Sequence, residues 1–445
     1  MTSSPADRAQ RGKDARKYVA RSAHGLWLPP VERPDPIAVL ERQGRDRLPE
    51  LLPVRHGRMS TSPLAFLRGA AAVMAADLAA QPHTGLTVQL CGDAHLLNFG
   101  LYTSPDGTLL FDLTDFDETF PGPFEWDVKR LAASVAVAAR ENGHPEPKVR
   151  QAALAAAAGY HTAIRRLARL GELAAWYERV ETDRLLPLVR DGRRRPQSSL
   201  TRARRRTSLH ALGRLTETVD GRRRIVRDPP FLESVGPSDT AALRKLFSDY
   251  RSTLSEGRRL LLDRYRFADA VRKVVGVGSV GTRCFLVLLA GVDDDDPLLL
   301  QIKEARESVL ERHLPSGPYV HPGHRVVAGQ RLLQAAGDIF LGWTTGPQGR
   351  AFYLRRLRDT KGPANVAGAS PAALRRYARL CGTVLARAHA RSGDRIAIAS
   401  YLGSADTFDR SVADFATAYA DRTADDHSDL VAAVAAGVVR AAPGS

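Results

Sequence analysis

The sequence has few cysteines and no long hydrophobic run, and both absences exclude classes of protein. Its three cysteines, Cys91, Cys284 and Cys381, form no CxxC pair. An odd number at such spacing argues against a disulfide framework and against a structural zinc site. The longest alanine-rich stretches fall short of the roughly 20 apolar residues that span a bilayer. Residues 1–22 are polar and basic, without the apolar run of a signal peptide. We therefore expect a soluble, cytoplasmic protein with no membrane partner.

Acidic residues are also fewer than basic residues. The chain carries 49 Asp and Glu against 65 Lys and Arg, a formal net charge of +16. Such a balance favours an anionic partner, for example a nucleotide, a phosphorylated metabolite or nucleic acid. The arginine clusters of residues 193–206 are either a solvated surface or a means of capturing an anionic substrate or nucleic acid. Few aromatic residues lie between these arginines, so nucleic-acid binding by base stacking has weak support.

At 445 residues the chain is too long for one ordinary core, because single cores stop growing at about 250–300 residues. Periodicity and turn residues predict a mixed α+β protein in four parts. These are an N-terminal arm, a helical part, a small β-rich part and a set of closing helices, at residues 1–50, 51–270, 271–362 and 363–445.

Individual elements follow from the same signals. We expect helices at residues 63–80, 125–186, 240–270, 324–336 and 371–390, and a pair of short helices within 406–440. We expect strands at 86–90, 109–113, 284–289, 298–303, 338–343 and 352–357. Residues 291–297 (GVDDDDP) are predicted to form the acidic tip of a β-hairpin between the third and fourth of these strands.

The first constellation of polar residues follows the strand at 86–90. Residues 91–100 (CGDAHLLNFG) place Asp93, His95 and Asn98 in one tight loop, and the strand at 109–113 returns Asp115 and Asp117 to it. Phosphoryl transfer uses such a set, because one aspartate orients the acceptor hydroxyl while amide and carboxylate oxygens hold Mg²⁺. Asp93 and His95 are the candidate catalytic residues. Asn98, Asp115 and Asp117 are the candidate metal ligands.

A second constellation lies far downstream. Residues 276–281 (GVGSVG) precede a strand, and the next strand ends in Lys303. Glycines that precede a strand argue against a dinucleotide fold, where they open a helix. A glycine turn lets backbone amides approach a triphosphate, and a lysine on the neighbouring strand neutralises its oxygens. We expect Gly276, Gly278, Ser279 and Gly281, together with Lys303, to bind nucleotide.

The motifs CGDAHLLNFG and LTDFDE resemble the H-G-D-x-H-x-x-N and I-D-F/W-D motifs of the aminoglycoside-phosphotransferase branch of the protein-kinase-like superfamily. Cys91 stands where that family has a histidine. The resemblance implies that Asp93 is the catalytic base and that Asn98 and Asp115 bind metal. It also implies that Asp127, in FEWDVKRL, is a buried anchor of the loop. His389 is interpreted as a core histidine.

The resemblance implies a two-lobed, kinase-like fold, but the motif order is reversed. Kinases place the glycine loop and lysine before the catalytic loop, whereas here Asp93 comes first. Either the fold is circularly permuted, with the small β-rich lobe encoded late, or one motif match is accidental. The whole pattern also resembles a bacterial family of uncharacterised proteins, through GDAHLLNFG, GVGSVGTR, IKEA and shorter pieces such as Arg58-Met59 and FLRG (residues 66–69). Kinases pair the lysine with a glutamate, and Glu307 is the expected partner of Lys303.

These observations predict a phosphotransferase that uses ATP and Mg²⁺ on a small-molecule acceptor. One alternative is transfer of AMP on the same scaffold with the nucleotide reversed. Another is a non-catalytic protein that binds nucleotide or nucleic acid.

Overall fold

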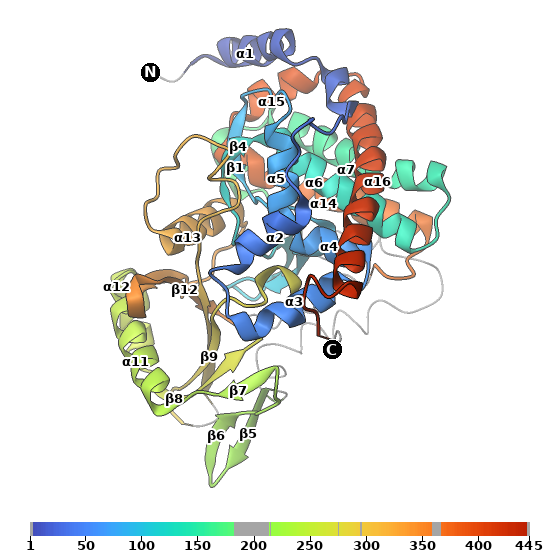
Figure 1. Cartoon of the computed structure of the whole chain (residues 1–445). Helices are drawn as coiled ribbons and strands as arrows, with labels where there is room; N and C mark the ends of the chain where they lie inside the picture. Colours follow the sequence, from blue (N-terminus) through green and yellow to red (C-terminus); the bar gives the residue numbers. More distant parts are fainter. Residues whose placement is uncertain are drawn as a thin grey trace.

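The computed structural model describes residues 3–181, 213, 215–274, 276–293, 296–357 and 366–442. The arginine clusters at residues 193–206 lie outside this part of the chain. The predicted α+β class is confirmed. Figure 1 shows two groups of elements, a helical body and an antiparallel sheet with its own helices. No helix in the described ranges is long and apolar enough to cross a membrane.

The helical body is assembled from both ends of the chain. Its helices are α1 (Pro5–Tyr18), α2 (Pro36–Gly44), α3 (Leu52–Met59), α4 (Pro63–Gly69), α5 (Ala71–Ala79), α6 (Phe124–Glu141), α7 (Glu146–Leu167), α8 (Glu172–Tyr177), α14 (Pro371–Ser392), α15 (Arg395–Leu402) and α16 (Thr407–Ala435). The core helix α6 is buried over almost its whole length and packs against α7, α14 and α16 (Figure 1). Residues after 366 therefore complete a core begun by residues before 181.

Two of these helices approach closely because each carries a glycine at the contact. A Cβ on Gly382 of α14 would lie 2.0 Å from the carbonyl oxygen of Ala156 in α7. A Cβ on Gly159 of α7 would lie 2.2 Å from the carbonyl oxygen of Arg379 in α14. No side chain can occupy such a space, so the backbones of α7 and α14 pack directly on each other.

Short strands on the body carry the first group of polar residues. Strand β1 (Thr87–Leu90) pairs with β4 (Phe120–Pro123), and β2 (Phe99–Thr103) pairs with β3 (Leu109–Leu113). The loop between β1 and β2 includes the 3₁₀ turn η3 (Leu96–Asn98). Two further 3₁₀ turns belong to the body, η1 (Arg21–Gly25) and η2 (Pro49–Leu51).

A six-stranded antiparallel sheet forms the second group, in the order β11-β12-β10-β9-β8-β7. Its strands are β7 (Leu232–Ser234), β8 (Arg266–Lys273), β9 (Cys284–Ala290), β10 (Pro297–Glu304), β11 (Gly342–Thr345) and β12 (Ala351–Arg356). With it lie α11 (Pro237–Arg251), α12 (Glu256–Leu262), α13 (Pro322–Leu333), the turns η5 (Val277–Ser279) and η6 (Pro347–Gly349), and the hairpin of β5 (Thr216–Val219) and β6 (Arg222–Ile225).

Alternation along β10 decides which side chains face the helical body. Leu298, Leu300 and Ile302 join the apolar cluster formed with α11 and α12 on one face of the sheet. Side chains alternate along a strand, so Gln301 and Lys303 point to the opposite face. The sheet thus buries its leucines under α11 and presents its lysine toward the body.

The N-terminal segment, predicted as an arm, contains ordered helices that pack on the body. Arg33 forms buried ion pairs with Asp77 of α5, at 2.7 Å, and with Asp426 of α16, at 2.7 Å. The helix α1 packs against α15. These ion pairs tie the N-terminal segment to the far end of the chain. Because the pairs are buried, salt and solvent screen the attraction between their charges only a little.

Several predicted element boundaries are wrong, for local reasons. The helix expected at 63–80 is broken at Ala70, where Arg55 donates a hydrogen bond to the Gly69 carbonyl at 2.7 Å. The helix expected at 125–186 breaks at Gly143, which has a φ of +70°, followed by Pro145. The last part of the helix expected at 240–270 belongs to β8, because pairing with β9 overrides local propensity.

Other predictions differ by less. The pair of short helices expected within 406–440 is the single helix α16, and the strand expected at 338–343 begins at Gly342. The helix expected at 324–336 is α13 (Pro322–Leu333). The predicted pairing of β9 with β10 is confirmed, with Pro297 opposite Ala290, while residues 294–295 of the acidic tip lie outside the described part of the chain.

The close contact between α7 and α14 gives the first testable prediction. Gly382→Ala should lower the free energy of unfolding by about 1–3 kcal/mol, because its methyl group has no space beside the Ala156 carbonyl. Chemical denaturation of both proteins measures this difference. The matched control is Gly257→Ala in α12, where a Cβ meets no atom within 4 Å. Equal stability of the two variants would contradict the proposed packing constraint.

Candidate active site

A buried carboxylate holds the start of the loop at residues 91–100. Asp127, in the first turn of α6, accepts hydrogen bonds from the backbone amides of Cys91 (2.7 Å) and Gly92 (3.0 Å). His389 lies 3.1 Å from the same carboxylate and is itself fully buried, as expected of a core histidine. Asp127 therefore has the anchoring position that the sequence motif implied.

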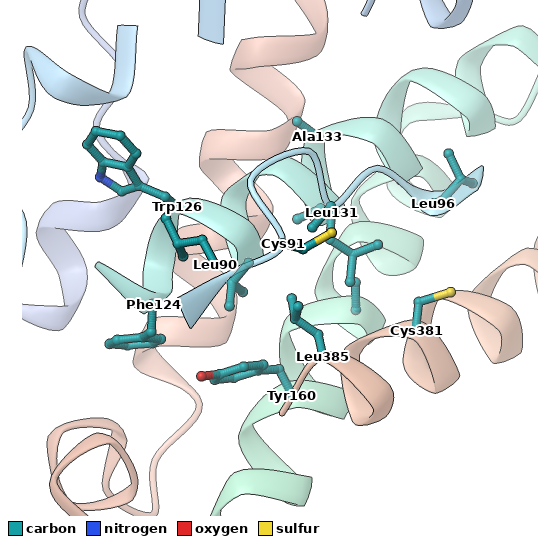
Figure 2. Packing of buried hydrophobic residues seen from close by; sticks show 14 of the residues in the cluster. Leu90, Cys91, Leu96, Phe124, Trp126, Leu131, Ala133, Tyr160, Cys381 and Leu385 are labelled. Atoms are coloured by element: carbon teal, nitrogen blue, oxygen red, sulfur yellow. The ribbon is translucent and has the colours of Figure 1, made fainter. Parts of the chain in front are cut away.

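The two residues at the start of this loop are fixed by packing. Gly92 has a φ of +86°, and a Cβ there would lie 2.0 Å from the Glu118 carbonyl oxygen, so only glycine fits. Figure 2 shows Cys91 within the main hydrophobic cluster, near Leu131 and Leu385. Its thiol donates to the Asp115 carbonyl at 3.2 Å, and burial raises the thiol pKa well above its usual value. Cys91 thus joins the two motif segments and is not a reactive nucleophile.

Asp93 lies at the surface of the cleft, with 17% of its side chain exposed. Its Oδ1 accepts from Arg130 of α6 at 2.7 and 2.9 Å, and its Oδ2 lies 3.7 Å from His95 Nε2. The Asn98 amide nitrogen donates to the Asp93 carbonyl at 2.7 Å, which leaves the Asn98 amide oxygen for another partner. A partly exposed carboxylate oriented by a buried arginine is well placed to accept a hydrogen bond from a substrate.

Asp117 forms the centre of a second, buried cluster. Its Oδ2 lies 2.5 Å from the Lys303 amine of β10, and its Oδ1 accepts from the Tyr353 hydroxyl of β12 at 2.6 Å. Burial alone would raise the pKa of Asp117, but the charge of Lys303 and hydrogen bonds from Lys303 and Tyr353 lower it to about 2. Asp117 is thus a carboxylate that neutralises the lysine.

Asp115 has a different environment. Burial, followed by the charge of Asp117, raises its pKa, while Lys303 and Arg355 oppose that shift. Two carboxylates, Asp115 and Asp117, thus lie close to two cationic groups, Lys303 and Arg355, and carboxylate oxygens are ligands that a hard cation such as Mg²⁺ prefers. The oxygens of Asp115 and Asn98 fit such an ion. In the described ranges, however, no three or more His, Cys, Asp or Glu side chains are grouped as a metal site.

The glycine turn is held from the helical body. It contains η5 and joins β8 to β9; the sequence predicted the strand after the turn, but a helix at 240–270 in place of the start of β8. Arg47 donates to the carbonyls of Val280 and Gly278, and the Leu48 amide donates to the Gly281 carbonyl at 2.8 Å. At its tip, the Ser279 hydroxyl donates to Asp117 Oδ2 at 3.1 Å. The turn therefore closes over the same carboxylate that binds Lys303.

Two cavities, of about 490 and 460 Å³, open onto these groups. Both are lined by six of the same residues, namely Arg68, Asp93, Asn98, Asp115, Gly278 and Ser279. His95, Gly276 and Lys303 line the smaller one, and Asp117 and Glu307 line the larger. The residues of the two distant motifs thus share one cleft.

Two of the predicted residues do not have the position that the sequence implied. Gly281 lines neither cavity, and its φ of +87° serves the turn. Glu307 is exposed, and in the described part of the chain the carboxylate that contacts the Lys303 amine belongs to Asp117. The expected Lys303–Glu307 pair is thus replaced, because Lys303 and Tyr353 are opposite one another on β10 and β12 and both reach Asp117.

Sequence reasoning did not assign a role to Arg47, Arg68, Arg130 or Tyr353. Arg68 belongs to the FLRG piece singled out above, and Arg130 to FEWDVKRL, so position in a motif was an available signal for both. Arg47 and Tyr353 have no local pattern, because their contacts are made across the fold.

The buried imidazole of His95 gives a second prediction. Burial is the main cause that lowers its pKa to about 4, so it is neutral at pH 7. Between pH 6.5 and 4 the unfolded chain binds a proton that the folded chain does not, so the free energy of unfolding falls as pH falls. His95→Gln should reduce this slope by up to about 1.4 kcal/mol per pH unit, measured by denaturation at several pH values.

His24 is buried too, with a pKa lowered to about 3 mainly by burial, so the slope should shrink without vanishing. The exposed His83 offers the control variant His83→Gln. An unchanged slope in His95→Gln would rule out a neutral, buried His95.

Comparison with known proteins gives one match. A search of the curated proteins and a search of the solved structures found no significant match. The family model described as "Uncharacterized protein conserved in bacteria (DUF2252)" matches residues 47–433, a range that includes both motif groups and the whole sheet. The chain therefore belongs to this bacterial family.

Proposed function

We propose that the protein is a phosphotransferase that uses ATP and Mg²⁺ to phosphorylate a small-molecule acceptor. The observation that supports it best is the contact of Lys303 with Asp117, residues from two motifs 186 positions apart. A chance match of either motif would not be expected to place its residues in a cleft shared with the other. The proposal includes a cytoplasmic location, where ATP is available.

The proposal includes a permuted, two-lobed, kinase-like arrangement. The glycine turn between β8 and β9 followed by the lysine of β10 is the order of a kinase nucleotide lobe. The helices α14 to α16 return to the body after this sheet. Moving the chain ends from one surface position to another changes connectivity and leaves such packing intact.

Each group has a role in this reaction. Asp93 accepts the proton of the acceptor hydroxyl while the oxygen of that hydroxyl forms a bond to the γ-phosphorus of ATP. The bond between the γ-phosphorus and the β–γ bridging oxygen breaks, and its electron pair leaves on ADP. Lys303 and the amides of the glycine turn hold the phosphates, and His95 and Arg130 position Asp93. Asn98 and Asp115, with Asp117 adjacent, would hold Mg²⁺, which neutralises phosphate charge when bound.

Asp93, the group proposed to accept the proton of the substrate hydroxyl, provides the test. Asp93→Asn should lower turnover by about 100-fold or more while ATP still binds, because the variant loses a proton acceptor and keeps the nucleotide contacts. Turnover is measured by mass spectrometry of a metabolite mixture after incubation with ATP and Mg²⁺. Binding is measured by the thermal shift that ATP and Mg²⁺ produce. The control is Asp414→Asn, which alters an exposed surface ion pair with Arg150.

The other outcomes identify the alternatives. An AMP-sized adduct would favour nucleotidyl transfer, and ATP binding without turnover by the wild-type protein would favour a non-catalytic nucleotide-binding protein. The absence of any thermal shift with ATP and Mg²⁺ would contradict all the nucleotide-based readings.

A further inference from the structure

Arg68 is an arginine of the cleft to which the reaction proposed above gives no role. Arg68 is in the last turn of α4, is partly buried and lines both cavities. Its Nε is fully buried without a hydrogen-bond acceptor. Within the described ranges no carboxylate forms an ion pair with its guanidinium. Burial lowers its pKa, and Asp93 is the nearby charge that opposes this shift. A partly buried cation that lacks an acceptor is stabilised when an anion binds beside it, and the position of Arg68 in the cleft makes it a candidate for such a contact.

The backbone on both sides of Arg68 is held by buried arginines. Arg130, which binds Asp93, also donates to the Leu67 carbonyl at 2.6 Å, and Arg55 donates to the Gly69 carbonyl at 2.7 Å. Gly69 leaves room for the side chain of Met59, whose Sδ would lie 2.5 Å from a Cβ at residue 69. The base of Arg68 is therefore rigid and is tied to the residue that orients Asp93.

The guanidinium lies beneath the glycine turn. A Cβ on Gly276 would be 4.0 Å from Nη2 of Arg68, and a Cβ on Gly278 would be 3.4 Å from the backbone carbonyl oxygen of Arg68. Arg68 thus occupies the space between the turn that would hold the phosphates and the carboxylate that would receive the acceptor. In the proposed reaction the transferred group passes through this space.

Neighbouring arginines are already engaged. Arg130 binds Asp93, Arg47 binds carbonyls of the glycine turn, and Arg350 binds Glu304 at 3.3 Å. Arg306 binds Asp46 at 3.1 Å. These four arginines have acceptors in the protein, whereas Arg68 lines both cavities and has a buried Nε without an acceptor in the described part of the chain.

We infer that Arg68 binds the γ-phosphoryl group of ATP and stabilises it during transfer. This inference rests on the proposed function. The planar guanidinium offers several donors to phosphate oxygens, and an arginine supplied by the same chain can stabilise the charge of the transferred group. ADP lacks that group, so the contact discriminates between the two nucleotides.

The difference between ATP and ADP tests this contact without knowledge of the acceptor. Isothermal titration with Mg²⁺ and each nucleotide should show tighter binding of ATP by the wild-type protein. Arg68→Gln should weaken ATP binding about tenfold and leave ADP binding nearly unchanged, because one charge-assisted contact is lost. Arg68→Lys should retain part of the ATP preference. Arg410→Gln, at an exposed position on α16, is the matched control for lost charge.

The outcomes separate this inference from the proposed function. If Arg68→Gln folds and keeps the wild-type ratio of ATP to ADP affinity, Arg68 does not contact the γ-phosphoryl group, although the phosphotransferase proposal stands. An equal loss for both nucleotides would assign Arg68 a structural role and would overturn the inference too. If Arg68→Gln fails to fold, the binding of ATP and ADP by Arg68→Lys decides. A charge-based contact would be contradicted if this variant lost the whole preference for ATP, and equally if it kept the full preference. No binding of either nucleotide by the wild-type protein would overturn both proposals.

Discussion

The arrangement of the cleft depends on the ion pair between Lys303 and Asp117. Lys303 is buried, with 4% of its side chain exposed, and Asp117 is partly buried; a lone lysine charge in such a position would be strongly unfavourable. Burial lowers the pKa of Lys303, yet Asp115 and Asp117 raise it well above its usual value. The lysine comes from the sheet and the aspartate from the helical body. Keeping both charges paired therefore requires the sheet to face the body in one orientation, with Tyr353 completing the contact.

Buried arginines add a second set of connections between the same parts. Arg325 of α13 donates to the Thr119 and Asp117 carbonyls, and Arg387 of α14 binds Asp112 and the Leu333 carbonyl. These contacts satisfy backbone oxygens next to the candidate catalytic residues. The segment around Asp115 and Asp117 is thus fixed by groups from three other regions of the chain. Precise placement of carboxylates requires such support, since the loop itself makes few regular hydrogen bonds.

Chain order matters less to this architecture than packing does. The body is closed by α14 and α16, which follow the sheet in sequence, and the glycine contacts of Gly159 and Gly382 join the two halves directly. The N-terminal segment also contributes, because Arg47 holds the glycine turn and Arg33 links Asp77 to Asp426. Segments from both ends of the chain therefore build the body on which the cleft lies.

The local features of the site and of the sheet could be predicted from the amino-acid sequence alone. The loop of residues 91–100, the glycine turn and the β9–β10 hairpin could be predicted because each depends on short-range geometry: turn glycines, alternating apolar residues and strand ends. Asp127 and His389 were correctly read as buried. Helix boundaries near Ala70 and Gly143 were missed, since a tertiary hydrogen bond ends one helix and a positive φ the other.

Which residues meet in the cleft depends on the tertiary structure. Glu307 was expected beside Lys303 because kinases pair this lysine with a glutamate. The register of β10 with β12 instead places Tyr353 opposite Lys303, and both side chains contact Asp117. The position of Arg68 under the glycine turn likewise depends on the packing of α4 against η5. Charge pairing across the cleft is set by the docking of the sheet on the body, a long-range arrangement that local propensity does not encode.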